Sequence, residues 1–556
     1  MVAADQAIRV NSPLSSIGTA ECRRWSDGIF KKHQPIDGYL KAFYLQNARE
    51  YDHVHANQEL RKISKRLMWD GFSCSVTADD DSIHNLAEAT ARQCDKIFNR
   101  WASVADIHTI KSHLVAYCQR LGFDFPCNAN PSDDEESVCN KVLAGIARIC
   151  DDRWWVRKIR KAFNRRIETI LLDLGVVNSK TKSSYISKFL LSRFIGQQSR
   201  NQKVINSLDC VRNDGLVVSM ADCVSASVAN PVNRRNELMV RVRGYEEIAT
   251  GLGLSGVMLT LTCPSRFHAF LSVGRKNPKY QGKTPTDGME WLNKTWQKIR
   301  SKWARKGIKP FGFRVTEPQH DATPHFHILL FVENSHLDLL IDIFKEKALE
   351  DTPNEPGAKK HRCDVLRIDP AKGSAAGYIA KYIAKNIDGF SNDYDYEAGC
   401  DGEEGALRVR AWASLWNIRQ FQQIGCVSVT VWRELRRKVD GEKDNPELLN
   451  KLRVAADSGN WALFVELMGG PTVKQDEQAL RPHREESDIP NRYGERVEKL
   501  IGVTLQRVSS RVFVTRDHTW VVEHKARVIE ENPVRYELEE ESFLRRAPPV
   551  DLDLCQ

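Results

Sequence analysis

Two histidines and two tyrosines stand at spacings that would gather four reactive side chains. His325 and His327 flank one residue at the start of an apolar run reaching Val332, which is typical of a strand. Side chains alternate across a strand, so both imidazoles would share one face, as a metal site needs. Tyr378 and Tyr382 are four residues apart in a helical pattern, which places both phenols on one helix face. A cation beside two positioned phenols suits the breaking and rejoining of a DNA strand through phosphotyrosine.

An upstream carboxylate would complete the metal site. Glu317 follows a predicted strand at 311–316, and a hairpin would bring it beside His325 and His327. Two imidazoles and one carboxylate suit Mg²⁺ or Mn²⁺ and leave positions open for phosphate oxygens. His320 is a poorer third ligand because it falls in the turn.

Two lysines accompany the tyrosines. Lys381 and Lys385 each follow a tyrosine by three residues, so either ammonium could stabilise a phenolate or the charge of a phosphate. A phenol has an ordinary pKa of about 10 and must lose its proton as it attacks. The alternative interpretation is that Tyr378 and Tyr382 pack the apolar face of their helix. Their order and distance relative to the histidines favour the catalytic interpretation.

The elements that would position these residues form one continuous pattern. It predicts a strand at 257–262, a helix at 286–306, a hairpin of strands at 311–316 and 326–332, a helix at 337–349, a strand at 363–368 and a helix at 375–386. Helices and strands in this order indicate an α+β domain in which helices cover an antiparallel sheet.

Three of these segments resemble, in order, the motifs of HUH endonucleases that start rolling-circle replication: Leu259-Thr-Leu-Thr262, His325-Phe-His327 and Tyr378-x-x-x-Tyr382. The run Tyr-Ile-Ala-Lys-Tyr-Ile-Ala-Lys-Asn at 378–386 is similar to the replication gene A proteins of tailed bacteriophages, as are the segments 316–327 and 411–425. The resemblance covers roughly 251–437.

This resemblance implies a ferredoxin-like catalytic sheet, Mg²⁺ or Mn²⁺, and a 5′-phosphotyrosine intermediate with a free 3′-hydroxyl. It carries the metal role to His325 and His327 and the nucleophilic role to Tyr378 and Tyr382. Glu317 as third ligand rests on the expected hairpin geometry alone.

Basic residues cluster at two places and predict DNA contacts. The segment 153–166 holds seven basic residues among fourteen around an apolar helical stripe, which fits either a helix laid on phosphates or a solvated amphipathic helix. The segment 408–439 is predicted to be further helix, where Trp412, Trp416 and Trp432 could stack unpaired bases or form core. The candidate contacts are Arg157, Lys158, Arg160 and Lys161 in the first segment, and Arg419, Arg433, Arg436 and Arg437 in the second.

Composition limits the class of protein. The chain has 556 residues, 41% hydrophobic and 28% charged, with a formal net charge of +9 that favours polyanionic partners. No apolar run is long enough to span a membrane, and the start lacks a secretory pattern. The 14 cysteines form no Cys-x-x-Cys pair, which disfavours zinc ribbons. A cytoplasmic protein is expected, and the resemblance to bacteriophage proteins implies a bacterial host.

Four segments are expected along the chain. A mainly helical region at 1–235 would bind DNA, an HUH endonuclease domain would occupy 236–395, and a helical extension would follow at 396–468. A linker, a small hairpin at 504–528 and a flexible tail would fill 469–556. The expected partners are the single-stranded origin region and a host helicase.

Several alternatives are weighed by motif order. Gln281-Gly-Lys-Thr284 ends like a phosphate-binding loop, but Asn277 stands where glycine is required, so no nucleotide cofactor is expected. A second His-x-His, His53-Val-His55, lacks an upstream acid strand and a tyrosine helix, and is interpreted as structural. A relaxase of the HUH superfamily is one alternative, but relaxases place the tyrosine before the histidines, which is the reverse of the order in this chain. An HUH transposase is another alternative, but such enzymes are usually shorter. A non-catalytic DNA-binding protein remains the alternative from another class.

Overall fold

A computed structural model describes residues 14–130, 132–178, 183–271, 273–390, 393–437, 445–505 and 511–525. The chain divides into two compact units, one of Met1–Val176 with Glu486–Val497 and one of Val177–Glu485 with Glu498–Gln556. The chain leaves the first unit near 176, and the four expected segments stay a prediction. The expected tail at 526–556 and part of the expected hairpin lie outside the described residues.

The first unit is built from helices. They are α1 (Ala20–Lys32), α2 (Asp37–Glu50), α3 (His53–Arg66), α4 (Asp80–Trp101), α5 (Ile107–Arg120), α6 (Glu135–Ile149) and α7 (Asp152–Asp173), with short strands β1 (Met68–Trp69) and β2 (Cys74–Ser75). Aspartates begin several of them: the side chains of Asp79, Asp106 and Asp134 accept hydrogen bonds from the first turns of α4, α5 and α6. The apolar stripe of α7, which includes Trp155, Ile159 and Phe163, is fully buried, so the segment 153–166 is a helix as expected.

The second unit contains a five-stranded antiparallel sheet in the order β11-β6-β7-β5-β8. Its strands are β5 (Ser255–Thr262), β6 (Phe311–Pro318), β7 (Pro324–Val332), β8 (Cys363–Arg367) and β11 (Phe421–Ile424). Strand β11 corrects the expectation that 408–439 is continuous helix, since it pairs with β6 at one edge of the sheet. The other strands and the longer helices between them lie where the sequence pattern predicts them, whereas the short helix at Ala358–His361 was not predicted.

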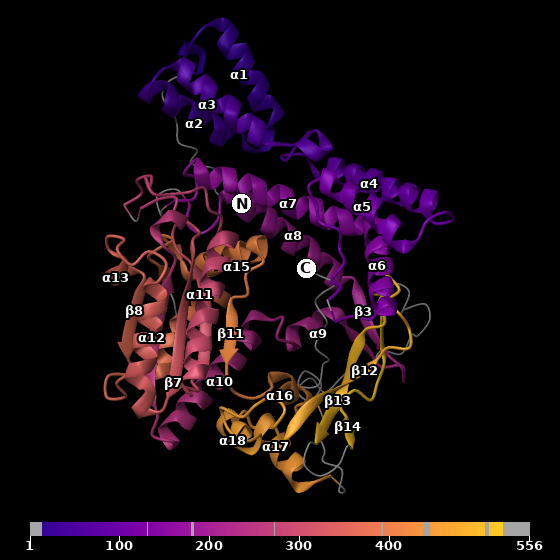
Figure 1. The fold of residues 1–556 in the computed structure, drawn as a ribbon, viewed down its shortest axis with the longest axis vertical. Coiled ribbons are helices and arrows are strands. Elements are labelled where there is room, and N and C mark those ends of the chain that lie inside the picture. The colour runs from indigo at the N-terminus through magenta and orange to yellow at the C-terminus, as the bar shows by residue number, and fades with distance from the viewer. Residues whose placement is uncertain are drawn as a thin grey trace. The chain divides into compact units, whose positions relative to one another are not determined.

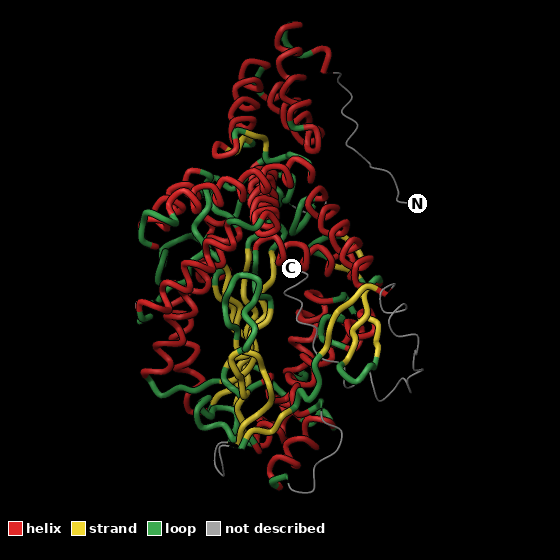
Figure 2. Tube along the Cα trace, turned by 90° about the vertical axis from the view of Figure 1, so that its right-hand side faces the viewer, coloured by secondary structure: helices red, strands yellow, loops and turns green. Residues whose placement is uncertain are grey.

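Helices bury both faces of this sheet (Figures 1 and 2). Phe313 and Leu329 point to one face and pack with Ile379 and Ile383 of α14 (Ala375–Ile387) and with residues of α10 (Pro231–Gly251). Ile328 and its neighbours on the other face pack against α11 (Pro285–Arg305) and α12 (Leu337–Leu349). Strands β6 and β7 are buried along their whole length, so polar residues placed on them are shielded from water.

The remaining elements of the second unit lie outside the five-stranded sheet. The further helices are α8 (Lys188–Asn206), α9 (Met220–Ala226), α13 (Ala358–His361), α15 (Gly402–Trp416), α16 (Val429–Leu435), α17 (Glu447–Asp457) and α18 (Trp461–Leu467). The small sheets are β9 (Tyr394–Asp395) with β10 (Cys400–Asp401), β12 (Leu480–Glu486) with β13 (Glu498–Leu505) and β14 (Val512–Val514), and β15 (Trp520–His524) with β3 (Leu208–Arg212) and β4 (Val217–Ser219).

Two expectations about the C-terminal part change. The predicted linker from 469 contains strand β12, and β15 pairs with β3 instead of joining a local hairpin with β13 and β14. Such pairings join residues about three hundred positions apart, which local sequence patterns do not reveal. Among the described helices, none combines the length and apolar content that a membrane span needs.

Gly312 of β6 is expected to be indispensable for stability. A Cβ atom there would lie 2.0 Å from the backbone oxygen of Leu329, at a φ of 155°. Gly312→Ala should therefore destabilise the protein by about 3 kcal/mol or more, lowering Tm by about 5–10 °C in a thermal melt. Gly251→Ala is the control, because nothing lies within 4 Å of that position at the end of α10 and Tm should hold or rise slightly.

Candidate active site

The hairpin of β6 and β7 sets the candidate metal ligands side by side. In its register Glu317 lies directly opposite His325, and Val315 lies opposite His327. Directly opposite residues of an antiparallel pair point to the same face, so the carboxylate and both imidazoles share the face that α14 covers. The expected one-face arrangement of the two histidines and Glu317 is found.

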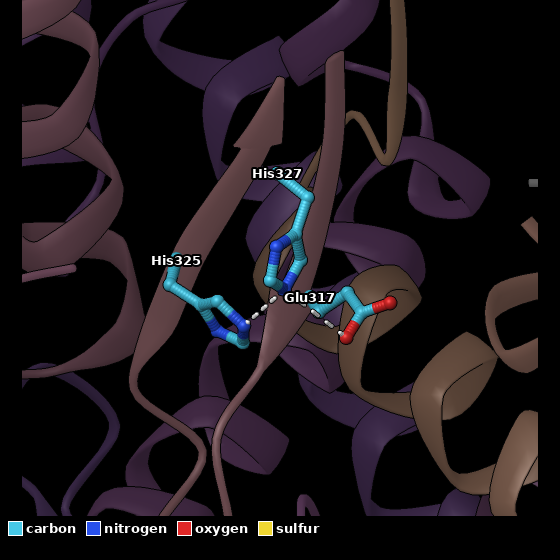
Figure 3. A group of neighbouring side chains, drawn as sticks. All are labelled: Glu317, His325 and His327. Carbon is cyan, nitrogen blue, oxygen red and sulfur yellow. Dashed lines mark hydrogen bonds and ion pairs between the residues drawn. The ribbon is translucent and has the colours of Figure 1, made fainter. Parts of the chain in front are cut away.

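The three ligand atoms converge at one point (Figure 3). Nε2 of His325 lies 2.8 Å from Nε2 of His327, and Oε2 of Glu317 lies 3.8 Å from Nε2 of His327. All three side chains are buried, with exposed fractions of 2% for Glu317 and 7% for each histidine. The other ring nitrogen of His327 is fixed 3.2 Å from the hydroxyl of Thr260 on β5.

This donor set fits a divalent cation. Burial lowers the pKa of His325 to about 4 and the pKa of His327 well below its ordinary value, so both rings are neutral at physiological pH. Two neutral rings whose Nε2 atoms face each other share one hydrogen at most, so a lone pair is directed at the point of convergence. Adjacent ligand atoms at about 2.1 Å from Mg²⁺ would be about 3 Å apart, close to the spacing of the two nitrogens.

Glu317 is held by residues of α14. Its Oε1 accepts a hydrogen bond of 2.8 Å from Nδ2 of Asn386, whose Oδ1 accepts one of 3.1 Å from Gln420. Its Oε2 lies 3.7 Å from Nζ of Lys385. Burial raises the pKa of Glu317, and the nearby Lys385 ammonium lowers it by a smaller amount. The net result is a pKa of about 7.

The pKa of Glu317 gives the site an expected pH dependence. Since burial holds the pKa of His325 at about 4 and that of His327 well below its ordinary value, Glu317 is the candidate ligand that takes up a proton as pH falls through about 7. Affinity for Mn²⁺, measured by electron paramagnetic resonance, should fall about tenfold per pH unit below this point.

The stability of the metal-free protein should change in the opposite direction. A carboxyl group whose folded pKa lies above its ordinary 4.5 favours the folded state more as pH falls from about 7 toward 4.5. Glu317→Gln should therefore make both the residual Mn²⁺ affinity and this part of the stability insensitive to pH in the range. Equal pH slopes in the variant and the wild type would contradict the assignment.

The two tyrosines of α14 are both half-buried. Ser374 begins the helix by accepting a hydrogen bond from the backbone N–H of Gly377, and Ile379 and Ile383 anchor it to the sheet. The ring of Tyr382 stacks on the imidazole of His327, with centroids 3.9 Å apart and an interplanar angle of 21°. Tyr378 lies one turn earlier on the same helix and is half-buried.

The two lysines of α14 have different neighbours. Nζ of Lys381 lies 4.8 Å from the centroid of the Tyr382 ring, so this ammonium is beside a candidate nucleophile. Lys385 instead contacts carboxylates, with Nζ 3.0 Å from Oε2 of Glu397 and 3.7 Å from Glu317. Although burial opposes its charge, these carboxylates raise the pKa of Lys385.

Sequence reasoning missed three residues around Lys385. The hydroxyl of Tyr185, which is fully buried, donates to Asp395 at 2.9 Å and lies 3.3 Å from Oε2 of Glu397. Glu397 also accepts a hydrogen bond of 2.8 Å from the backbone N–H of His320 in the β6–β7 turn. These residues come from segments about two hundred positions apart and carry no shared motif. Only the tertiary fold reveals them.

The candidate DNA contacts lie in mixed surroundings. On α7, Arg157 and Lys158 are exposed, and Arg160 lies 3.1 Å from Asp80. Near α16, Arg433 pairs with Glu237 and Arg437 with Glu434, whereas Arg419 and Arg436 are exposed. The tryptophans at 412, 416 and 432 are buried, which agrees with the core interpretation. His53 and His55 lie in the first turn of α3, where residues two apart do not share a face.

Comparison with known sequences places the chain in a family. A sequence model for the bacteriophage replication gene A protein (GPA) matches residues 80–390. The chain belongs to this family. The gene A match includes Glu317, both histidines of the site and both tyrosines of α14, whereas β11 lies beyond it. No solved structure matches the chain.

Individual gene A relatives are similar over much of the chain. The replication protein of Haemophilus phage HP1 is 37% identical over 514 residues, which cover 86% of this chain and 65% of the relative. The replication gene A protein of Escherichia phage 186 is 39% identical, covering 70% and 58%. A probable replication endonuclease from a prophage-like region of Salmonella typhi is 34% identical, covering 65% and 47%. The chain thus spans between about half and two thirds of the length of these relatives.

Proposed function

We propose that this chain starts rolling-circle DNA replication by cutting and rejoining one DNA strand through a phosphotyrosine bond. In this proposal the five-stranded sheet is a ferredoxin-like HUH domain and the strand cut is the single-stranded origin. The observation that carries it is the Tyr382 ring stacked 3.9 Å from the His327 ring, beside a buried Glu-His-His group. The replication and endonuclease names of the gene A relatives support it.

The residues of the site divide the chemistry between them. Glu317, His325 and His327 would hold Mg²⁺ or Mn²⁺, which when bound withdraws charge from the scissile phosphate and orients it. The phenol oxygen of Tyr378 or Tyr382 forms a bond to phosphorus as it loses its proton. The bond from phosphorus to the 3′-oxygen breaks, and that oxygen takes up a proton to leave a free 3′-hydroxyl.

The ammonium groups of the two lysines on α14 have different roles in this step. Lys381, beside the Tyr382 ring, stabilises the phenolate and the crowded phosphate oxygens. Lys385 has a different place in the mechanism: its contacts with Glu317 and Glu397 hold the Glu317 carboxylate toward the histidines. We therefore assign Lys385 to positioning of a metal ligand and Lys381 to the reacting groups.

Two tyrosines permit a complete round of replication. One phenol cuts the origin and keeps the 5′ end, and the second cuts the regenerated origin after one round. The 3′-hydroxyl released by the second cut then attacks the first phosphotyrosine bond and closes a circle. Each exchange replaces one phosphodiester by another, so joining needs no nucleotide hydrolysis. A separate host helicase would unwind the duplex.

The proposal is tested by trapping the covalent intermediate. The protein is incubated with Mn²⁺ and a library of single-stranded oligonucleotides, and the products are separated on denaturing gels. The expected result is protein attached to the 5′ end of the downstream fragment, with a free 3′-hydroxyl on the other. A DNA-binding protein without catalysis would leave every strand intact, which would refute the proposal. A chelator supplies the control without metal.

A further inference from the structure

Arginines gather where helices α10, α15 and α16 meet the edge strand β11. They are Arg234, Arg235, Arg241, Arg410, Arg433 and Arg436. We call these six residues the arginine cluster. The protein packed around the Arg234 guanidinium lowers its pKa, and so do Arg410, Arg433 and Arg241 in turn, although the residue keeps part of its surface exposed to solvent. These like charges therefore lie close together.

The carboxylates next to the arginine cluster are already paired. Glu237 accepts two hydrogen bonds from Arg433, of 3.0 and 2.7 Å, and Arg241 lies 3.5 Å from the same carboxylate. Asp388 lies 2.5 Å from Arg235. Among the residues that the structure describes, two carboxylates thus face six guanidinium groups, an excess that calls for an anionic partner.

Two guanidinium groups of the cluster have unused donors. The Nε atoms of Arg241 and Arg410 are buried and have no hydrogen-bond partner among the described residues. Arg241 as a whole is 7% exposed. Buried N–H groups normally have partners, because leaving one unpaired costs free energy. An anion bound at the cluster would supply acceptors where the protein offers none.

An aromatic surface adjoins the arginine cluster. Phe421 of β11 stacks on Phe313 of β6, with centroids 6.1 Å apart and an interplanar angle of 24°. The Arg234 guanidinium lies 5.2 Å from the Phe421 centroid, and Arg241 lies 5.9 Å from that of Phe313. Phe421 is half-buried and Arg234 is exposed, so a flat group can reach this layer from solvent. Stacked aromatic rings beside arginines are a typical binding surface for unpaired bases.

The sheet register places this surface next to the candidate active site. Phe421 pairs with Val315, and Val315 pairs with His327, so the three residues form one row on the same face. Two strand spacings separate Phe421 from His327, a distance of about 10 Å. About three nucleotides stacked at 3.4 Å would cover this distance.

We propose that the arginine cluster and Phe421 bind the single strand a few nucleotides from the phosphate that is cut. Arg234, Arg241 and Arg410 contact its phosphates, and one unpaired base stacks on the layer formed by Phe421 and Arg234. This inference rests on the proposed nicking function and adds to it a binding site for the strand at the β11 edge of the sheet. The stacking contact requires an unpaired base, so the site distinguishes single strands from duplex.

Substitutions in the full-length protein test the inference. The variants are Arg234→Gln, the double variant Arg234→Gln with Arg410→Gln, and Phe421→Leu. The control is Arg243→Gln, an exposed residue of α10 that points away from the face carrying Arg234 and Arg241. Affinity for fluorescein-labelled single-stranded and duplex DNA is measured by anisotropy over a range of salt concentrations.

The double variant should bind single strands about 10–100-fold more weakly, and its log–log salt slope should fall by about 1.4, or 0.7 for each lost phosphate contact. Arg234→Gln alone, at an exposed position, should lower the salt slope by about half as much as the double variant does. Phe421→Leu should weaken single-strand binding about tenfold and leave duplex binding unchanged. Salt slopes equal to those of Arg243→Gln would overturn the phosphate contacts, and equal losses on both DNA forms would overturn the stacking contact.

Three further measurements separate the possible failures. Mn²⁺ affinity of all variants should equal that of the wild type, since none of the substituted residues belongs to the metal group. If the wild type forms no covalent adduct while the salt slopes change as expected, the nicking proposal fails and the binding site stands. If polyglutamate displaces single-stranded DNA from the wild type at equal charge concentration, the cluster binds acidic protein and the inference fails.

Discussion

Replacing both Tyr378 and Tyr382 by phenylalanine should reduce formation of the covalent protein–DNA adduct by about a thousandfold or more. Phenylalanine keeps each ring but removes the oxygen that would bond to phosphorus, so the nucleophile is lost. The ring of residue 382 should still stack on His327, and Mn²⁺ affinity should therefore remain unchanged. Adduct yield on denaturing gels, measured alongside Mn²⁺ binding, checks both halves of this expectation.

The single substitutions test whether the two phenols alternate. Tyr378→Phe and Tyr382→Phe should each retain some cleavage, because the other phenol remains on the same helix face. Neither should release closed circles, because the second cut needs a second nucleophile. Circle yield in a replication assay on a nicked template measures the difference. Closed circles at normal yield from either single variant would refute alternation while leaving tyrosine chemistry intact.

Replacing His325 or His327 by alanine should lower Mn²⁺ affinity by about a hundredfold or more and suppress cleavage to the same degree. Replacing a residue that only orients a metal ligand typically lowers metal affinity or activity 10–100-fold, so replacing a ligand itself should lower them at least as much. The chain supplies a matched control, because His53→Ala and His55→Ala change a second His-x-His motif, at the start of α3. Those two variants should bind Mn²⁺ like the wild type.

The outcomes for the two histidine pairs are separable. Loss of cleavage without loss of Mn²⁺ affinity in His327→Ala would mean that His327 supports Tyr382 through stacking rather than holding metal. Loss of Mn²⁺ affinity in the His53 or His55 variants would place the ion elsewhere. Thermal melts of all four proteins show whether a loss comes from unfolding.

The grouping of Glu317 with His325 and His327 could be predicted from the sequence because it depends on local geometry. Alternation along a strand places His325 and His327 on one face, and a hairpin with a short turn brings Glu317 opposite them. The helix of Tyr378 and Tyr382 was predictable for the same reason, since helical spacing is local. The side of the sheet on which that helix packs was not, and the stacking of Tyr382 on His327 is known only from the tertiary structure.

Other parts depended on contacts that sequence patterns do not encode. Strand β11 has only four residues between helices, too few to show a period, and its pairing with β6 defines it. Tyr185 and Glu397 are in contact but lie far apart in the sequence, so no sequence spacing predicts their contact. The sequence around Trp412 fits a base-stacking role as well as a core position, because an aromatic residue beside arginines is compatible with both. Its burial and its hydrogen bond of 2.9 Å to the backbone oxygen of Ala322 place it in the core.

The turn between β6 and β7 also has a consequence for protein engineering. Gln319 and Thr323 close it by a backbone hydrogen bond of 2.8 Å, and Ala322 adopts a left-handed conformation with φ of 67°. Shifting β7 by one residue would place Phe326 opposite Glu317 and leave the carboxylate facing an oily side chain. Loop grafts between homologous proteins should therefore preserve the number of residues in this turn, while its composition can vary wherever the left-handed position is respected.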